Sequence, residues 1–185
     1  MLQLFKKYKA VLRFMLIFLG SYIVLSVFYD WYLDLSPFRN YYPDFFTFLV
    51  SKQSATVIEL FGYSSRIIAF KDEPAIHLLV NQRFMASIVE GCNSISVLIL
   101  FVSFILAFFA RFKPTFLYIL VGTVIIYIMN LVRIAVLSIG IYEYPQYTVL
   151  LHSIVFPLMI YGTVFLLWIF WVRLYTNITA GEKTL

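Results

Sequence analysis

Four apolar segments, separated by short polar stretches and one long polar insert, dominate the chain. They run over about residues 11–33, 93–110, 114–139 and 151–172, and a membrane-crossing helix needs about 20 such residues. The pattern predicts an all-α fold, a polytopic bundle of about four transmembrane helices. At 185 residues, the whole chain is expected to form a single domain.

The insert over residues 34–91 predicts structure outside the membrane. Its part from 43 to 61 is apolar, so a fifth span is the alternative, but Lys52 at mid-bilayer would cost roughly 2.5–3.5 kcal/mol. We therefore predict an amphipathic helix that lies on the membrane surface, with Pro43 at its start and Gly62 as its C-terminal stop.

Short extended segments follow this surface helix. Residues 66–70 and 76–80 flank the charged turn 71–74 and predict a small β-hairpin, and residues 84–89 predict a further extended piece. The insert is therefore expected to combine one helix with a little β-structure.

Composition strengthens the membrane interpretation. Hydrophobic residues make up 63% of the chain and charged residues 12%, with a mean hydropathy of +0.92, whereas soluble proteins average about 25% charged residues. The net charge of +5 raises the possibility of a nucleic-acid partner. The cations flank the apolar segments instead of forming one run, so no such partner is expected.

The two sides of the predicted bundle differ in charge. Lysines and arginines collect before the first segment, between the second and third and after the fourth, whereas nearly all acids fall in the insert or at Glu143. The basic residues are Lys6, Lys7, Lys9, Arg13, Arg111, Lys113, Arg173 and Lys183. The positive-inside rule predicts cytoplasmic termini and an extracytoplasmic insert, and Trp168, Trp171 and Tyr175 predict an aromatic belt at the end of the last span.

Three residues with side chains suited to catalysis stand near one end of the predicted spans. Cys92 opens the second span, Arg133 lies late in the third, and His152 opens the fourth. Each lies about 19–21 residues from the cytoplasmic flank of its helix, or roughly 28–32 Å. All three should therefore lie at one level near the outer face of the membrane.

Each of these residues also has a structural interpretation. A single membrane cysteine packs like a small apolar side chain, an interfacial histidine can hydrogen-bond a helix start, and Arg133 can snorkel to the headgroups. An ionisable residue inside a span is nevertheless costly and marks a functional site by default. The sequence leaves open whether the three helices turn these groups toward one another.

Together the three groups could perform nucleophilic acyl transfer. A cysteine thiolate attacks a carbonyl, a histidine takes and returns the proton, and an arginine holds the developing oxyanion. A helix N-terminus at Cys92 would favour the thiolate. The thioester on Cys92 would be resolved by an amine in transpeptidation or by water in proteolysis.

Other chemistries find no support in the sequence. With one cysteine, neither a disulfide within the chain nor paired-thiol exchange is possible. Metal-ligand motifs, phosphate loops and the G-x-S-x-G element do not occur, so no metal and no cofactor is expected. His77, near Glu73, is interpreted as a surface residue.

Around the three candidate residues, the chain resembles the exosortase/archaeosortase family of membrane proteins. Cys92-Asn93-Ser94-Ile95 stands where that family has Cys-Ser-Gly-Ile, and Asn130-Leu131-Val132-Arg133-Ile134 and then His152 match its later motifs in order. The resemblance covers about residue 62 to the last span. The shortness of the chain makes it most similar to the short F-type exosortases of Bacteroidetes.

The resemblance implies a membrane-embedded cysteine transpeptidase or protease, with Cys92 as nucleophile, His152 as proton shuttle and Arg133 as oxyanion clamp. Its partners would be membrane lipid and exported proteins whose C-terminal sorting signal is cut at the outer face of a bacterial inner membrane. The alternative is a non-enzymatic assembly factor or small transporter subunit, with Arg133 as a structural or anion-binding group.

Overall fold

Long apolar runs form the membrane-length helices of the protein. The computed structural model describes residues 8–35, 43–70 and 73–181. Within these residues, α2 (Lys9–Leu35), α5 (Phe112–Glu143) and the helical stretch Pro145–Ile178 are long and apolar enough to cross a bilayer. The predicted helical membrane bundle is confirmed to this extent.

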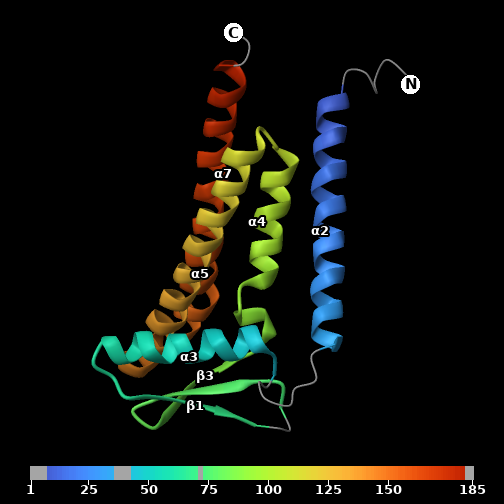
Figure 1. Ribbon diagram of the computed structural model, residues 1–185. Coiled ribbons are helices and arrows are strands. Elements are labelled where there is room, and N and C mark those ends of the chain that lie inside the picture. Colours follow the sequence, from blue (N-terminus) through green and yellow to red (C-terminus); the bar gives the residue numbers. More distant parts are fainter. Residues whose placement is uncertain (1–7, 36–42, 71–72, 182–185) are drawn as a thin grey trace.

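Helix α4 (Ile95–Ala107) is the shortest member of the bundle. Its 13 residues span about 20 Å, less than the roughly 30 Å of a hydrocarbon core. It lies beside α2 and packs against that helix as well as α5 and α7 (Figure 1). A full crossing by the segment 93–110 therefore remains a prediction.

The last helical stretch begins earlier than expected. A short turn, η2 (Pro145–Tyr147), is followed by α6 (Thr148–Leu150), a π-helical turn η3 (Leu151–Val155) and α7 (Phe156–Gly181). His152 was predicted to open this span, but it lies inside the π-helical turn. A π turn adds a residue to the helical repeat and so changes which side chains face the same way.

Helix α3 (Phe45–Leu60) confirms the helix predicted within residues 43–61, and it lies across the end of the bundle beside the sheet (Figure 1). It begins after Asp44, whose side chain accepts hydrogen bonds from the backbone N–H groups of Phe46 and Thr47, as expected for an N-cap. It ends before Gly62, which has a φ of +87°, a conformation that glycine adopts without strain.

The predicted hairpin and extended piece form a single antiparallel sheet. The strands β1 (Ser65–Ala69), β2 (Ile76–Val80) and β3 (Arg83–Ile88) pair in that order. Asn81 and Gln82 both have positive φ, as in the tight two-residue turns that match the twist of a hairpin. The alternate residues of β2 are buried beneath α3 and α5, so the sheet closes the end of the bundle.

Two apolar cores hold these layers together. One joins α3, the sheet and the adjoining part of α5, and the other joins α4, α5 and α7 around Phe101 and Trp171. Trp171 is fully buried, and its indole N–H donates to the Phe108 carbonyl at 3.2 Å. The prediction that Trp171 belongs to an aromatic belt was therefore wrong, because it packs between helices.

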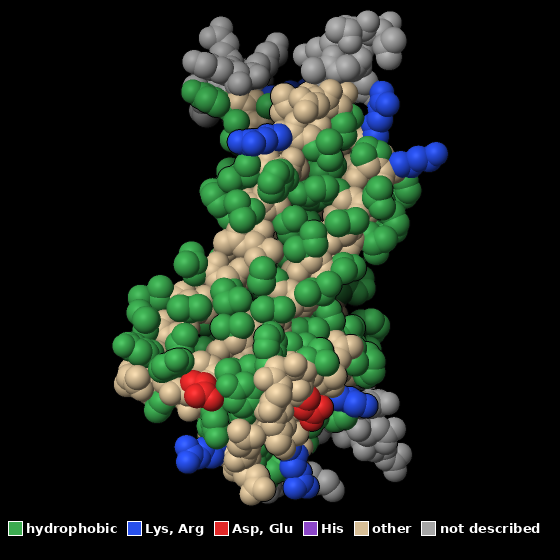
Figure 2. Space-filling view, turned by 90° about the vertical axis from the view of Figure 1, so that its left-hand side faces the viewer, with side chains coloured by type: hydrophobic (Ala, Val, Ile, Leu, Met, Phe, Trp, Pro, Cys, Tyr) green, Lys and Arg blue, Asp and Glu red, His purple; other side chains and the backbone are tan. Residues whose placement is uncertain are grey.

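On the face shown in Figure 2, the charged side chains lie toward the two ends of the molecule. Helix α2 begins and α7 ends at the same end (Figure 1), and the visible face carries a broad hydrophobic band between basic ends, with acids only near the sheet (Figure 2). The predicted contributions of Lys6, Lys7 and Lys183 to the basic side, and of Lys71 and Asp72 to the hairpin turn, fall outside the described residues.

Candidate active site

Cys92 lies in a short turn between the sheet and α4. The 3-10 turn η1 (Glu90–Cys92) follows β3 closely, and the Cys92 N–H donates to the Val89 carbonyl at 2.8 Å. Ser94, with a φ of 65°, then redirects the chain into α4. The expectation that Cys92 occupies a helix N-terminus was wrong, because α4 begins only at Ile95.

Helix α5 holds this turn from one side. Asn130 is fully buried, and its Nδ2 donates to the Cys92 carbonyl at 2.9 Å. Cys92 itself is a half-buried free cysteine, and it packs against the core cluster that contains Ile134 and Ala135 of α5. The backbone of the candidate nucleophile is thus fixed to the helix that carries Arg133.

Asn93 holds the same turn from the other side. Its Nδ2 donates to the Tyr29 hydroxyl of α2 at 2.7 Å and to the Thr47 hydroxyl of α3 at 3.2 Å. Its Oδ1 accepts from the Ile95 N–H at 2.9 Å. The residue after the candidate nucleophile therefore ties together three elements that are far apart in the sequence.

Arg133 does not snorkel to the surface. Only 4% of it is exposed, and its guanidinium lies 3.6 Å from the centroid of the Phe156 ring. The buried Nε and Nη2 atoms have no hydrogen-bond partner within the described part of the chain. Their N–H groups lie on the same edge of the guanidinium, the edge that binds a carboxylate or an oxyanion with two parallel bonds.

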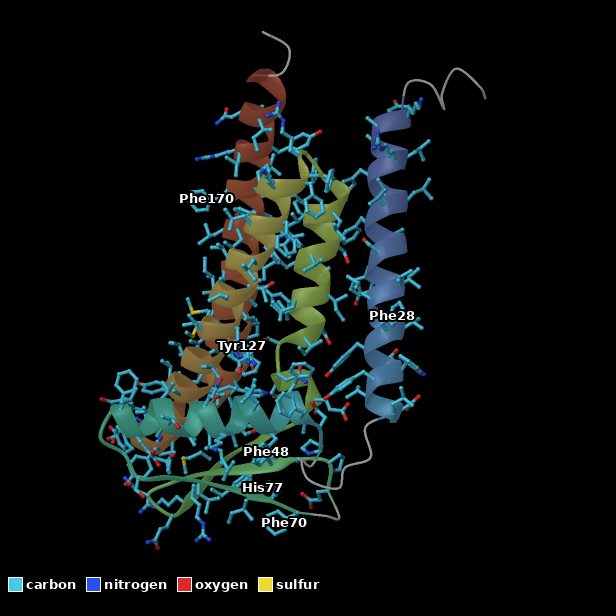
Figure 3. The ribbon with its side chains drawn as sticks, viewed as in Figure 1. Phe28, Phe48, Phe70, His77, Tyr127 and Phe170 are labelled. Atoms are coloured by element: carbon cyan, nitrogen blue, oxygen red, sulfur yellow. The ribbon has the colours of Figure 1, made fainter. Side chains whose placement is uncertain are left out.

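The electrostatic surroundings of Arg133 include Cys92. It lies within electrostatic reach of Cys92 and of Tyr161 on α7. Tyr127, one turn before Asn130 on α5, donates to Gln53 of α3 at 2.5 Å, and Figure 3 shows it at the crossing of these helices. The site therefore lies where α5 meets α3, beside the turn that bears Cys92.

His152 and Arg133 both contact the ring of Phe156. Its exposed ring stacks on the Phe156 ring, with centroids 5.3 Å apart. Phe156 thus contacts both the imidazole and the guanidinium. Among the described residues, no hydrogen bond joins His152 to Cys92, although catalytic hydrogen bonds often tighten only when substrate is bound.

Carboxyl groups lie on the α2 side of the turn. Glu90 and Asp30 line a cavity of about 330 Å³ between α2, the turn and α4. Burial and the nearby Asp44 raise the pKa of Glu90. Within residues 8–35, 43–70 and 73–181, no group of three or more His, Cys, Asp or Glu residues is placed to hold a metal ion.

His77 lies apart from this site. Its Nε2 is 3.3 Å from a carboxylate oxygen of Glu73, and its ring contacts those of Phe70 and Phe84. Figure 3 shows His77 and Phe70 at the sheet, beyond α3 from the helical bundle. His77, interpreted from the sequence as a surface residue, has 24% of its side chain exposed.

Comparisons with protein-family models, curated proteins and solved structures find no match to this chain. Its function is therefore inferred from the site and from the motifs around Cys92, Arg133 and His152.

Phe156 offers a direct test of how the site is held together. Replacing it with leucine keeps an apolar side chain of similar size but removes the ring on which the guanidinium and imidazole lie. Because a buried cation–π contact contributes up to about 2 kcal/mol, processing of an exported substrate, the activity expected from the sequence, should slow by up to about thirtyfold.

The variant Phe156→Tyr should retain most of the wild-type rate, since it keeps the aromatic face. Both variants should accumulate to wild-type levels in the membrane, and pulse labelling would measure processing. Equal rates for wild type and Phe156→Leu would contradict a positioning role.

Proposed function

We propose that this protein is a membrane-embedded cysteine transpeptidase or protease that acts on exported proteins. One observation carries the proposal: a free thiol lies within electrostatic reach of a buried guanidinium whose Nε and Nη2 bond to no described residue. Asn130 fixes the Cys92 turn to the same helix that presents Arg133. A buried arginine without a carboxylate partner is costly, and binding of an oxyanion would compensate for that cost.

The proposed reaction has two steps. The Cys92 Sγ attacks the carbonyl carbon of a peptide bond while Arg133 holds the oxyanion, and His152 accepts the thiol proton. The C–N bond then breaks, and His152 gives that proton to the leaving amine. An acceptor amine or water next attacks the thioester, the C–S bond breaks, and the thiol is regenerated.

The substrate class follows from the position of the site and from the family resemblance. A sorting signal with its own C-terminal transmembrane helix and basic tail would place a cleavable bond at the membrane–water boundary. With cytoplasmic termini in a bacterial inner membrane, the site would face the outside. The basic residues at the end where α2 begins and α7 ends support this orientation.

A non-enzymatic role remains the second candidate, because the unoccupied edge of Arg133 also suits a bound anion. The protein would then be an assembly factor or a small transporter subunit in which Arg133 is structural or binds an anion. The two candidates differ in whether the Cys92 thiol is required.

Labelling of the only cysteine tests the orientation. A membrane-impermeant maleimide added to spheroplasts should modify Cys92, because the half-buried thiol is expected to face the outside. Mass spectrometry of the intact protein would measure the modified fraction.

The matched control places a cysteine at the opposite end. Lys113→Cys in a Cys92→Ala background should react only after the membrane is opened, since Lys113 is exposed at the other end of α5. Modification of Cys92 only after permeabilisation would refute the proposed orientation of the site.

A further inference from the structure

A second cavity lies far from Cys92, at the end of the bundle where α2 begins. Its volume is about 560 Å³, and its walls come from the first turns of α2, the end of α4 and Tyr175 of α7. Helix α2 packs mainly against α4. The cavity therefore occupies a space between α2 and α7 that protein side chains leave open.

The mouth of this cavity is basic. Lys9 and Arg13 both line it, are exposed, and lie one helical turn apart on the same face of α2. Neither forms an ion pair with any residue in the described ranges, and no acid lines the cavity. Two cations therefore converge on one opening, and no anion among the described residues pairs with them.

The interior of the cavity is apolar and aromatic. Phe14 packs against Phe108 with ring centroids 4.7 Å apart, and Phe108 contacts Tyr175 at 5.7 Å. Ile17, one turn beyond Arg13 into the membrane-length part of α2, continues the apolar wall. Along α2, the wall of the cavity thus changes from positively charged at Lys9 and Arg13 to apolar at Phe14 and Ile17.

We propose that this cavity binds an anionic phospholipid, with the lipid phosphate at Lys9 and Arg13 and an acyl chain along the apolar wall. Charge complementarity selects an anion, and the adjoining apolar wall favours a lipid phosphate over free phosphate. The position also fits, because Lys9 begins a membrane-length helix and so lies at the headgroup layer. The bound lipid would join α2 to α7.

Thermal unfolding in detergent micelles tests this proposal on the full chain. Phosphatidylglycerol should raise the unfolding temperature more than phosphatidylcholine at the same mole fraction. In the double variant Lys9→Gln/Arg13→Gln, the apparent affinity for phosphatidylglycerol should fall about thirtyfold, since each cation near a lipid surface contributes a factor of about five.

Two control variants distinguish lipid binding in this cavity from non-specific attraction of anionic lipid to a basic protein. Lys113→Gln/Arg173→Gln removes the same charge from exposed positions that do not line the cavity, and it should bind phosphatidylglycerol like wild type. The charge-conserving variant Lys9→Arg/Arg13→Lys should also retain binding.

Three results would overturn the proposal. The first is that the Lys113/Arg173 variant loses as much affinity for phosphatidylglycerol as the Lys9/Arg13 variant. The second is that phosphatidylglycerol and phosphatidylcholine stabilise the protein equally. The third is that inorganic phosphate stabilises it as much as phosphatidylglycerol. The last would identify a site for free phosphate instead of lipid.

Discussion

Replacing Cys92 with alanine should abolish substrate processing while the protein still inserts into the membrane. The chain has no other thiol, and loss of a catalytic nucleophile commonly costs a factor of about 10⁶ in rate. The half-buried sulfur packs at the edge of a core cluster, so its removal should cost little stability. A co-expressed exported protein should then accumulate uncut, as measured by immunoblotting.

Two further variants sharpen this prediction. Cys92→Ser retains a hydroxyl of similar size but a much weaker nucleophile, so processing should still fall by at least about 10³. Ser96→Ala, in the first turn of α4, is the matched control and should process normally. In wild type alone, a covalent substrate adduct sensitive to neutral hydroxylamine should form. Continued processing by Cys92→Ala would rule out the proposed nucleophile.

Replacing Arg133 with methionine should abolish processing and yet make the protein more stable. The side chain is 4% exposed, and no carboxylate within the described residues forms an ion pair with it. Apolar replacement of buried charges often stabilises by about 1–4 kcal/mol, whereas the lost contact with Phe156 costs up to about 2 kcal/mol. We expect a net gain of about 1–2 kcal/mol in the free energy of unfolding.

The variant Arg133→Lys separates charge from geometry. It keeps a buried cation but loses the two parallel N–H groups of the guanidinium edge, so processing should fall without any gain in stability. Thermal unfolding in detergent and processing in cells would be measured on the same variants. Marked destabilisation by Arg133→Met would favour a structural role for the arginine and weaken the enzymatic proposal.

The surface helix and the strands were predictable because their signals are local. The apolar segment 43–61 and the glycine after it predicted a helix that ends before Gly62, and α3 has these approximate limits. The extended segments at 66–70, 76–80 and 84–89 correspond closely to β1, β2 and β3. Local patterns predict an element and its approximate limits. They did not predict the N-cap at Asp44, because it depends on hydrogen bonds from the side chain to the backbone N–H groups of Phe46 and Thr47.

The arrangement of the site was less predictable, because it depends on how each helix is rotated. Counting residues placed Cys92, Arg133 and His152 at one level, and the bond from Asn130 to the Cys92 carbonyl agrees with this for the first two. Neither Asn130 nor Phe156 was predicted as a site residue. Asn130 forms part of the quoted motif, but Phe156 is positioned by a π turn that has no hydrophobic signature.

The hydrogen bonds of Asn93 link the position of Cys92 to the thickness of the surrounding bilayer. Tyr29, near the end of α2, holds the residue directly after Cys92. A helix as long as α2 changes its tilt when the hydrocarbon thickness changes. A thinner or thicker bilayer would therefore move Tyr29 and, through its hydrogen bond to Asn93, shift the turn that bears Cys92. The position of the Cys92 sulfur would then depend on the length of the lipid chains.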